Sequence, residues 1–594
     1  MRGSNSYLLL LLLLAASIPD ARRAAATPPV PPAVAWPANG VTVVDRLYGF
    51  QLPSDVAPDG EGGAFVAWSD QQGEDETLDV RLHRVTAQGD IAWSHYPDGF
   101  PLGTAPGRQF LVRLVGDGAG GVIATWYDER GATPDIYALR VRADGTAEPS
   151  WPVAGLAVCD QPGAQMAPVI ASDDASGAYI AWEDQRDGAW NTRVYVQHIL
   201  ASGAIADGWP AGGMRVGNVE STEGEPTITT SPDGGAFVTW IRWTGETADI
   251  VTTRVTAAGS VAPGWPAGGL SVCAAPGHQD WPSTVSDGDG GIYAVWRDHR
   301  YEVDMVPPTV SGVFIQRVTG DAAIPSGWAE NGVAVRADSL DNPIPQLAED
   351  GLGGALVCWA DGTEYFVQRY DPAGAVAPGW KPEGVRVGAI AGFMDHPGLV
   401  GDGAGGAIAM WTEYHGPTGI DVYAQRIAAD GSVATGWPTS GTAVSATQEW
   451  EQFWRSDPRS GVAVSDGSGG ALVVWANSAP YGGVRMQRVN SFGAVGPLVR
   501  CPDCDLLERV FPNPAPGPLR VRVRIPEDMV AVTVDVFDVQ GRKRLSRRFR
   551  ELRPGGTADL NVDASNLPTG VYFVRVAGGR DRRALGTASV RVIR

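Results

Sequence analysis

The chain has 594 residues, of which 77 are Gly and 45 are Pro, and its formal net charge is −21. Gly and Pro together stay below the roughly 25% at which aperiodic disorder is expected, while 44% hydrophobic residues can fill sizeable cores. Only Lys381 and Lys543 are lysines among the 46 basic residues. Without a broad cationic surface to neutralise phosphates, nucleic acid is excluded as an expected partner.

The N-terminus has the pattern of an export signal. Arg2 precedes an apolar block from Leu8 to Leu14, and the small residues Ala24 and Ala26 follow. This pattern predicts a secretory signal peptide over residues 1–26. The apolar run is shorter than the ~20 residues that a spanning helix needs, and no later run approaches that length. We therefore expect no transmembrane span in the mature chain.

Export permits disulfides, but five cysteines do not make a disulfide framework. Cys501 and Cys504 form a single CxxC motif in a linker over residues 501–505, where they could close a small disulfide. A lone CxxC is weak evidence for zinc, so we expect no metal there. Cys358 stands beside Trp359 in an apolar run and is expected to be a buried thiol.

One unit recurs along most of the chain. Its first landmark is an Asp-Gly-x-Gly-Gly turn followed by an apolar run that ends in Trp, and two copies have a degenerate turn. The copies follow one another at intervals of about 58 residues, a period typical of repeat architectures. The terminal tryptophans of the eight runs are Trp68, Trp126, Trp182, Trp240, Trp296, Trp359, Trp411 and Trp475.

A second tryptophan precedes each of these, usually within Gly-Trp-Pro. In most units it stands about 31 residues before the strand Trp, whereas the distance onward to the next Gly-Trp-Pro varies. Insertions therefore collect in one half of the unit, and variable loops on one face of a repeat array are where binding surfaces usually lie. These residues are Trp36, Trp93, Trp151, Trp209, Trp265, Trp328, Trp380 and Trp437.

Each unit predicts four short strands, exemplified by residues 269–273, 281–285, 291–296 and 313–318. Four strands per repeat without helical periodicity predict an all-β fold, an eight-bladed β-propeller over residues 27–500, with seven blades if one copy is irregular. The first Trp-Pro strand, residues 36–44, has no unit before it, and the last unit lacks such a strand. Pairing the two would close the ring and remove both edges.

The composition changes near Asp505. Residues 505–594 contain 17 Lys and Arg against 10 Asp and Glu, a net charge of +7, which leaves −28 for the rest of the chain. The repeats end as well. Short antiparallel strands in a segment of this size predict an immunoglobulin-like sandwich over residues 506–594. The strand-like runs cover residues 519–525, 530–537, 558–562, 571–576 and 588–593.

Three motifs in this segment carry a family resemblance. They are Val510-Phe-Pro-Asn-Pro-Ala-Pro-Gly517, Val534-Asp-Val-Phe-Asp-Val-Gln-Gly-Arg542 and Leu567-Pro-Thr-Gly-Val-Tyr-Phe-Val-Arg-Val576. The segment resembles the type A C-terminal sorting domain of the bacterial type IX secretion system, and it is similar to the related FlgD-type Ig-like domain. The resemblance implies that the secretion machinery handles residues 506–594, and that the rest of the chain reaches the surface of a Gram-negative-type bacterium or is released. The dense arginines from Arg544 to Arg550 depart from the family pattern.

Two repeated polar motifs allow a structural and a functional interpretation. The Asp-Gly-x-Gly-Gly turn could hold calcium, yet each copy offers one or two carboxylates where calcium takes six to eight oxygens, and a glycine turn explains it better. Calcium thus stays a possible cofactor, and no other cofactor is expected. An Asp-x-Arg pair follows the strand Trp at Asp128, Asp184 and Asp298. We expect an ion pair that caps a hairpin rather than a ligand site.

Catalytic residues are not assigned. The only Arg-Ile-Pro of the sialidase kind begins at Arg524, inside the C-terminal domain, and the repeated turn resembles the sialidase Asp-box only loosely. The seven histidines share no spacing, and neither an HExxH nor a G-x-S-x-G motif occurs. A sialidase-like enzyme or another glycoside hydrolase on this scaffold remains the alternative hypothesis.

Five tryptophans stand outside the repeat: Trp190, Trp243, Trp281, Trp450 and Trp454. Because the other sixteen are accounted for as blade packing, these five are the candidate ligand-binding residues. We expect them to serve a non-enzymatic binding or adhesion module that recognises a glycan or a protein. A purely structural surface component is a further alternative, and it predicts self-assembly without a ligand.

Overall fold

The computed structural model describes residues 36–592, except 38, 46–49, 72–76, 218–219, 301–310, 341–342, 362–363, 390–396, 415–419, 446–450, 453–460, 478–482, 492, 494, 496–506, 512–518, 525–530, 539–542, 551, 554–556, 564–566, 568–569 and 579–582. The regular elements in these residues are all strands. The expected signal peptide, residues 1–26, and the linker with Cys501 and Cys504 lie outside the described residues and stay predictions.

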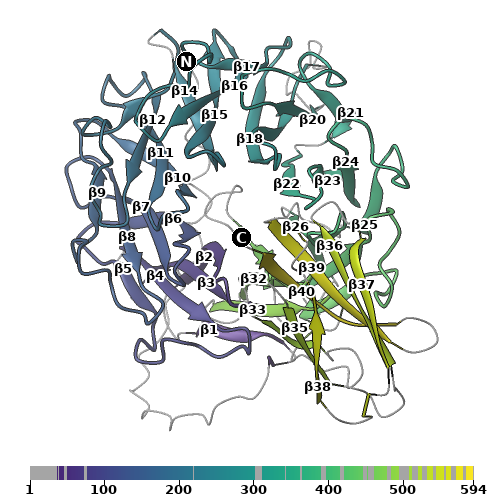
Figure 1. Ribbon diagram of the computed structural model, residues 1–594. Helices are drawn as coiled ribbons and strands as arrows, with labels where there is room; N and C mark the ends of the chain where they lie inside the picture. Colours follow the sequence, from purple (N-terminus) through teal and green to yellow (C-terminus); the bar gives the residue numbers. More distant parts are fainter. Residues whose placement is uncertain are drawn as a thin grey trace. The chain divides into compact units, whose positions relative to one another are not determined.

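Eight antiparallel blades, seven of four strands and one of five, surround a central axis, which confirms the predicted propeller and its blade count (Figure 1). In blades 1 to 7 the strands pair antiparallel in chain order, with the first strand nearest the axis. Blades 1 to 4 are β2 (Phe50–Pro58), β3 (Ala64–Gln71), β4 (Leu78–Val85) and β5 (Phe100–Gly103); β6 (Gln109–Gly116), β7 (Val122–Asp128), β8 (Asp135–Val141) and β9 (Leu156–Cys159); β10 (Gln165–Ser172), β11 (Ala178–Asp184), β12 (Arg193–Ile199) and β13 (Met214–Arg215); and β14 (Glu223–Thr230), β15 (Gly235–Thr244), β16 (Thr247–Thr256) and β17 (Leu270–Cys273).

Blades 5 to 7 repeat the same order, whereas blade 8 takes its outer strand from the N-terminus and contains one additional short strand. They are β18 (Gln279–Ser286), β19 (Ile292–Asp298), β20 (Ser311–Val318) and β21 (Val333–Leu340); β22 (Gln346–Glu349), β23 (Ala355–Asp361), β24 (Glu364–Tyr370) and β25 (Val385–Ala389); and β26 (Gly398–Gly401), β27 (Ala407–Tyr414), β28 (Ile420–Ile427) and β29 (Thr442–Ser445). Blade 8 contains β31 (Ala463–Ser465), β32 (Ala471–Asn477) and β33 (Gly483–Val489), with β30 (Glu451–Gln452) paired to the far end of β32.

The ring closes through its N-terminal strand. β1 (Val41–Asp45) pairs antiparallel with β33, so that Val41 lies opposite Met486, and it supplies the outer strand of blade 8. This confirms the closure predicted from the unpaired Trp-Pro strand at one end of the repeats. Pairing strands from the two ends covers the edge of β33 that would otherwise stay open to another chain.

The core lies between neighbouring blades. The second strand of a blade is an uninterrupted apolar run, and in β7 every residue is buried because a blade packs on each of its faces. The strand Trp has a glycine partner in its own blade. At Gly213 the backbone has a positive φ of 89°, and a Cβ there would stand 2.3 Å from Cη2 of Trp182. Only glycine accepts both conditions, which explains the Gly that follows each Trp-Pro.

The Gly-Trp-Pro tryptophans fasten each blade to the next. In all eight junctions the indole Nε1 donates to the carbonyl oxygen of a turn in the following blade, at distances between 2.8 and 3.1 Å. A buried indole N–H usually has such an acceptor, and this bond favours Trp over Phe at the position. The pairs are Trp36 with Ala87, Trp93 with Ala143, Trp151 with Ala201, Trp209 with Ala257, Trp265 with Gly320, Trp328 with Pro372, Trp380 with Ala429 and Trp437 with Ser491.

The Asp-Gly-x-Gly-Gly turns are capped by their own aspartates. Oδ1 of Asp117 accepts hydrogen bonds from the backbone N–H groups of Ala119 and Gly121, while Oδ2 accepts from Arg140 on the third strand. Nη1 of Arg140 then donates to the Ala201 carbonyl of the next blade. The turn aspartate therefore fixes the turn and orients an arginine that reinforces the tryptophan junction.

The propeller has two unlike faces. On the turn face lie the Asp-Gly turns and the Trp-Pro connections. On the loop face lie the connections from the second to the third strand of each blade and those from one blade to the next. The former range from two residues between Thr244 of β15 and Thr247 of β16 to a longer stretch between Asp298 of β19 and Ser311 of β20. Length variation is thus confined to the loop face, as the spacing of the tryptophans predicts.

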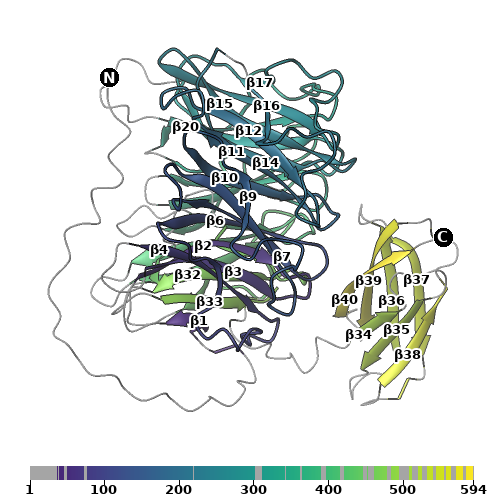
Figure 2. The same cartoon turned by 90° about the vertical axis from the view of Figure 1, so that its left-hand side faces the viewer.

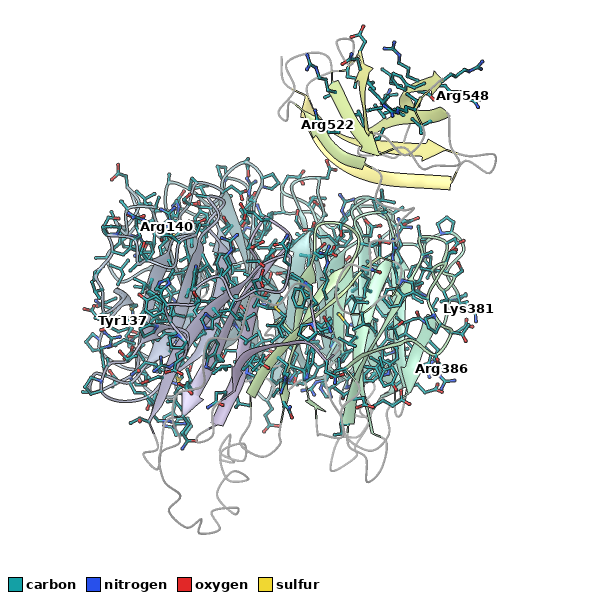
Figure 3. All side chains as sticks on the ribbon, turned by 90° about the horizontal axis from the view of Figure 1, so that it is seen from below. Tyr137, Arg140, Lys381, Arg386, Arg522 and Arg548 are labelled. Atoms are coloured by element: carbon teal, nitrogen blue, oxygen red, sulfur yellow. The ribbon has the colours of Figure 1, made fainter. Side chains whose placement is uncertain are left out.

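The C-terminal domain consists of a three-stranded and a four-stranded sheet around one apolar core (Figure 2). Sequence analysis predicts five of its strands and misses two. The missed β37 holds the arginine-rich run, in which Leu545 and Phe549 pack on the core while Arg548 is exposed, as is Arg522 on β35 (Figure 3). The strands are β34 (Leu507–Phe511), β35 (Leu519–Arg524), β36 (Ala531–Asp538), β37 (Lys543–Arg550), β38 (Thr557–Val562), β39 (Gly570–Gly578) and β40 (Arg583–Val592).

Candidate functional site

The loop face departs from the eightfold repeat at the position directly after the strand Trp. The turn face keeps one residue pattern in most blades, whereas this position differs from blade to blade. Structure alone does not require such variation, because each position has the same place in its blade. The residues, from blade 1 to blade 8, are Ser69, Tyr127, Glu183, Ile241, Arg297, Ala360, Thr412 and Ala476.

The inner strands of blades 2 to 5 contain a bulge at the mouth of the channel. Leu111, Ala167, Glu225 and Trp281 occupy equivalent places in it with φ between 49 and 56°, and the strand register shifts there. Positive φ is uncommon for residues other than glycine and is found where function or tight packing imposes it. The bulge also turns backbone N–H groups out of the sheet ladder, so they need other acceptors.

Two glutamates supply these acceptors across blade boundaries. Oε1 of Glu183 in blade 3 accepts from the backbone N–H of Glu225 in blade 4 at 2.8 Å, and Oε2 of Glu225 accepts from the N–H of Trp281 in blade 5 at 2.8 Å. Gly224 allows the approach, because a Cβ there would stand 3.2 Å from Glu183 and 3.3 Å from the indole of Trp243. Carboxylates and aromatic rings of three consecutive blades are thus gathered at one mouth.

Blade 5 adds a cluster of ionisable side chains. Asp280 pairs with Arg297, whose Nε lies 2.7 Å from Oδ1, and Nε2 of His278 and of His299 lie 3.5 and 3.7 Å from its carboxylate. Burial opposes the charge of Asp280, but the hydrogen bonds from Arg297 and the nearby imidazoles of His278 and His299 outweigh it and hold the pKa of Asp280 well below its usual range. The equivalent positions of other blades hold no such set, so the cluster is specific to blade 5.

Three of the five predicted ligand-binding tryptophans are described, and they lie on the loop face of consecutive blades. Trp190 is 90% exposed in the connection between β11 and β12 of blade 3. Trp243 in blade 4 and Trp281 in blade 5 are half-buried. Trp450 and Trp454 lie outside the described residues, on either side of β30. Sequence analysis missed Glu183, Glu225 and the Asp280 cluster, although an irregular residue after the strand Trp is a signal that could have identified Glu183 and Arg297.

A cavity of about 170 Å³ continues below this mouth in the channel. Five successive inner strands line it, from β2 in blade 1 to β18 in blade 5. Pro226 and Pro282 of the lining follow directly on the bulge residues Glu225 and Trp281, so the cavity begins where the mouth ends. The lining residues are Asp55, Arg113, Leu114, Val169, Ile170, Pro226, Thr227, Ile228, Pro282 and Ser283.

Asp55 and Arg113 are the charged residues of this lining, 9% and 6% exposed. Oδ1 of Asp55 accepts from the N–H of Gly461 in blade 8 at 2.9 Å, and Oδ2 accepts from the N–H of Leu114 in blade 2 at 2.8 Å. Burial raises the pKa of Asp55, although Arg113 and these backbone hydrogen bonds act in the opposite direction. A buried carboxylate beside a buried guanidinium gives the channel wall a compensated pair of charges.

A second hollow, of about 740 Å³, lies on the turn face among the turns of blades 1 to 3. Glycine backbone forms much of its wall, from Gly116 to Gly121, and Asp59, Glu61 and Asp174 add acidic groups. Its lining contains no aromatic side chain, and the Oδ1 of Asp59 is bound by the N–H groups of Glu61 and Gly63. The loop face therefore holds the richer set of binding groups.

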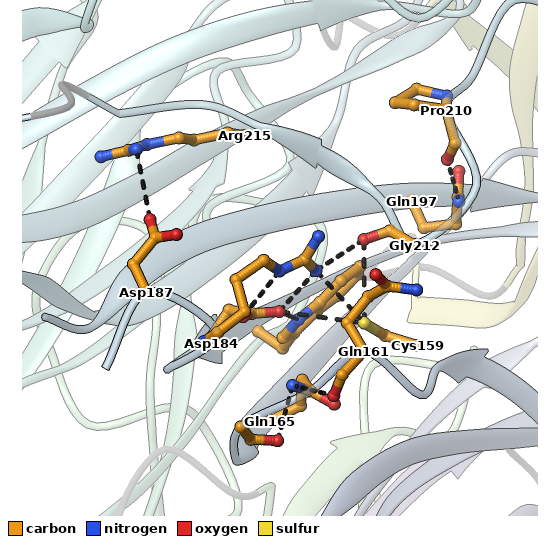
Figure 4. A network of polar contacts seen from close by, with 12 residues as sticks. Cys159, Gln161, Gln165, Asp184, Asp187, Gln197, Pro210, Gly212 and Arg215 are labelled. Carbon is orange, nitrogen blue, oxygen red and sulfur yellow. Dashed lines mark hydrogen bonds and ion pairs between the residues drawn. The ribbon is translucent and has the colours of Figure 1, made fainter. Parts of the chain in front are cut away.

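The Asp-x-Arg pairs have the structural role expected for them. Asp184 accepts hydrogen bonds from Nε1 of Trp182 at 2.8 Å and from the backbone and guanidinium of Arg186, which also donates to the Gly212 carbonyl and to Sγ of Cys159 (Figure 4). Asp128 and Asp298 repeat the first of these bonds with Trp126 and Trp296. The pair thus satisfies the buried indole and fixes the hairpin.

The described cysteines are buried free thiols. Burial raises the pKa of Cys159 and of Cys273 to about 12, and it raises that of Cys358 as well, so none is a reactive thiolate at neutral pH. Within the described ranges, no three His, Cys, Asp or Glu side chains are grouped as a metal site would need. Among the described residues, no helix has the length and apolar character that crossing a membrane requires.

Comparison with known proteins identifies one end of the chain. Residues 509–584 match the secretion system C-terminal sorting domain family. No curated protein matches the chain.

Solved structures give distant likenesses only. One is a protein of unknown function from Dyadobacter fermentans, with 10% sequence identity, coverage of 58% of this chain and 97% of that one, and a TM-score of 0.31. The polysaccharide lyase Uly1 has 11% identity, coverage of 77% of this chain and 98% of that one, and a TM-score of 0.38. An α-L-arabinanase of Penicillium chrysogenum in complex with arabinobiose has 12% identity, coverage of 64% of this chain and 93% of that one, and a TM-score of 0.29. Similarities of this size do not transfer a function to this chain.

Proposed function

We propose that this chain, which a type IX secretion system delivers to the surface of a Bacteroidetes-type bacterium or beyond it by means of its C-terminal sorting domain, binds a glycan there on the loop face of blades 3 to 5. Residues 506–594 are the part that the secretion machinery handles, and we infer an immunoglobulin-like fold for their two sheets. The eight-bladed propeller is the cargo. Its ligand site is the mouth formed around Trp190, Trp243 and Trp281.

One observation carries the proposal. The three described tryptophans that the repeat does not explain fall on three consecutive blades at one face, among carboxylates and an arginine that do not recur at the equivalent positions of the other blades. Folding needs the same residues in every blade, so residues that break the pattern together have another use. Indoles offer flat apolar faces to sugar rings, while Glu and Arg side chains suit hydroxyl groups.

The test is a glycan array probed with the full-length chain, followed by titration of each hit. Trp190→Ala should weaken a hit at least tenfold, since the exposed indole contributes little to folding. Val153→Ala is the matched control, because Val153 is 86% exposed on the turn face of blade 2 and should leave affinity unchanged. Failure of every glycan to bind, or equal loss in both variants, would contradict the proposal, as would capture of a protein ligand alone.

The alternative hypothesis, a glycoside hydrolase or lyase on this scaffold, is favoured by one feature of the same mouth. Glu183 and Glu225 come from different blades, as an enzyme would require, although each also accepts a backbone hydrogen bond. Incubation of each array hit with the protein separates the two functions. An enzyme would cleave its ligand and lose turnover in Glu225→Gln, whereas a binding module returns the glycan intact.

A further inference from the structure

We infer that the channel cavity beneath the mouth is a subsite for a single neutral pyranose ring, so that the protein takes its glycan end-on with the terminal sugar inserted between Asp55 and Arg113 on one wall and Thr227 and Ser283 on the other. This inference rests on the proposed function and specifies how the same site recognises its ligand.

The size of the cavity fits one ring. Its volume is about 170 Å³. An engineered protein cavity of ~150 Å³ holds a benzene ring, and a pyranose with its exocyclic groups is larger than benzene, so this space holds one pyranose ring at most. A longer glycan must then leave its remaining rings outside, across the mouth where Trp243 and Trp281 lie.

The chemistry of the lining fits a hydroxylated ring. Val169, Ile170 and the two prolines are apolar, while the polar groups are one carboxylate, one guanidinium and the hydroxyl groups of Thr227 and Ser283. An ionised carboxylate can accept about four hydrogen bonds, and three backbone N–H groups, those of Leu114, Gly461 and Val56, donate to Asp55. Asp55 can therefore accept a further hydrogen bond from a sugar hydroxyl without giving up its role between the blades.

The charge of the lining argues for a neutral sugar. Asp55 and Arg113 are its only ionisable side chains, and their charges cancel. An acidic sugar would bring a carboxylate close to Asp55 in a buried space, where like charges repel strongly. Neither wall of the cavity has a second cationic side chain that could compensate the added negative charge.

The position of the entrance follows from the chain order. Pro226 and Pro282 extend the bulge residues Glu225 and Trp281 directly into the cavity. The hollow on the turn face shares Leu114 with the cavity, but it has no aromatic ring on which a second sugar could stack. The glycan therefore enters from the loop face.

The experiment compares two serine variants of the full-length chain on one strand. Ser283→Leu fills the cavity, whereas Ser286→Leu places the same side chain further along β18, outside the lining. With the array hit as probe, we expect at least a tenfold loss of affinity for Ser283→Leu and less than a twofold change for Ser286→Leu. Circular dichroism and the unfolding midpoint establish that both variants are folded.

A second measurement does not depend on any variant. The wild-type protein is titrated with the hit oligosaccharide and with the same oligosaccharide carrying a bulky group on its terminal rings. End-on insertion predicts that the blocked form binds at least tenfold more weakly. Equal binding of both forms, or equal affinity of Ser283→Leu and Ser286→Leu, would overturn the inference while leaving glycan binding established. Absence of any glycan hit would remove the proposed function itself.

Discussion

Nε1 of Trp36 donates a 3.0 Å hydrogen bond to the carbonyl oxygen of Ala87, and this bond joins the last blade of the ring to the first. The two residues lie 51 positions apart near the N-terminus, yet Trp36 leads into β1, which belongs to blade 8, whereas Ala87 belongs to blade 1. Nη1 of Arg488 reaches the same carbonyl at 3.4 Å. The carbonyl at the closing junction therefore accepts from one tryptophan and one arginine, as the carbonyls of most internal junctions do.

Replacing this tryptophan should weaken the closure. Trp36→Ala removes a buried indole and its hydrogen bond, and a large-to-small change of this kind costs about 3 to 5 kcal/mol in unfolding free energy. Urea unfolding followed by circular dichroism measures it. Trp190→Ala is the control, with a change of about 0.5 kcal/mol or less because its indole is exposed. Equal effects of the two substitutions would show that the closing contact contributes nothing.

The junction between blades 3 and 4 should be the most sensitive to loss of its tryptophan bond. There His198 stands in the place of the usual arginine, pairs with Asp173 at 3.0 Å and stacks on Tyr179. The Ala257 carbonyl therefore depends on Trp209, whereas Ala429 has both Trp380 and Arg369 as donors. Trp209→Phe should cost about 0.5 kcal/mol more than Trp380→Phe, since it removes the side-chain donor of its junction, whereas Trp380→Phe leaves the donor Arg369 in place.

Thermal or urea unfolding of the two phenylalanine variants gives this difference directly, and they serve as controls for each other. The converse change is His198→Arg, which should stabilise the protein because an arginine there can reach both Asp173 and the Ala257 carbonyl. Equal destabilisation by the two Phe substitutions would mean that the second donor is without effect.

Asp135 should make the protein less stable as the pH rises. Burial, together with Asp160 and Asp128, raises the pKa of Asp135 to about 6. The folded state therefore holds the proton more tightly than the unfolded state, whose carboxyl has a pKa of about 3.9. The stability that protonated Asp135 contributes is lost as the pH rises from about 4 to about 6. Above that range its contribution no longer changes with pH.

Asp135→Asn removes this ionisation, so the variant should match the wild type near pH 3.5 and exceed it by about 1 kcal/mol at pH 7.5, solvent screening included. The unfolding midpoint across the pH range checks it. Asp144→Asn should act in the opposite direction at neutral pH, because hydrogen bonds from Thr146 lower the pKa of Asp144. A constant difference between Asp135→Asn and the wild type at all pH values would contradict the assignment.

Removal of the sorting domain should stop export. A chain that ends at Cys504 lacks the matched residues 509–584 and is expected to remain inside the outer membrane. Cell fractionation with an antibody against the propeller measures it, with the full-length chain as control. If the truncated chain reached the cell surface or the medium at unchanged levels, secretion would not depend on this domain.

Much of the propeller can be predicted from the sequence because the same local requirement recurs. Trp182 needs Gly213 beside it, and Trp209 needs a carbonyl in the next blade, so both leave a signal at a fixed spacing. β37 is missed for the opposite reason. Its exposed arginines obscure the two apolar residues, Leu545 and Phe549, that pack on the core.

The sequence by itself therefore determined the blade, its number and the strand that closes the ring, since a repeated contact within or between adjacent units recurs in the chain. Only the tertiary structure decided which residues meet at the axis. Asp55 and Gly461 lie 406 positions apart, and Glu183, Glu225 and Trp281 come from three blades. Such contacts occur once, between inner strands that closure of the ring brings together, and a contact made once leaves no period to detect.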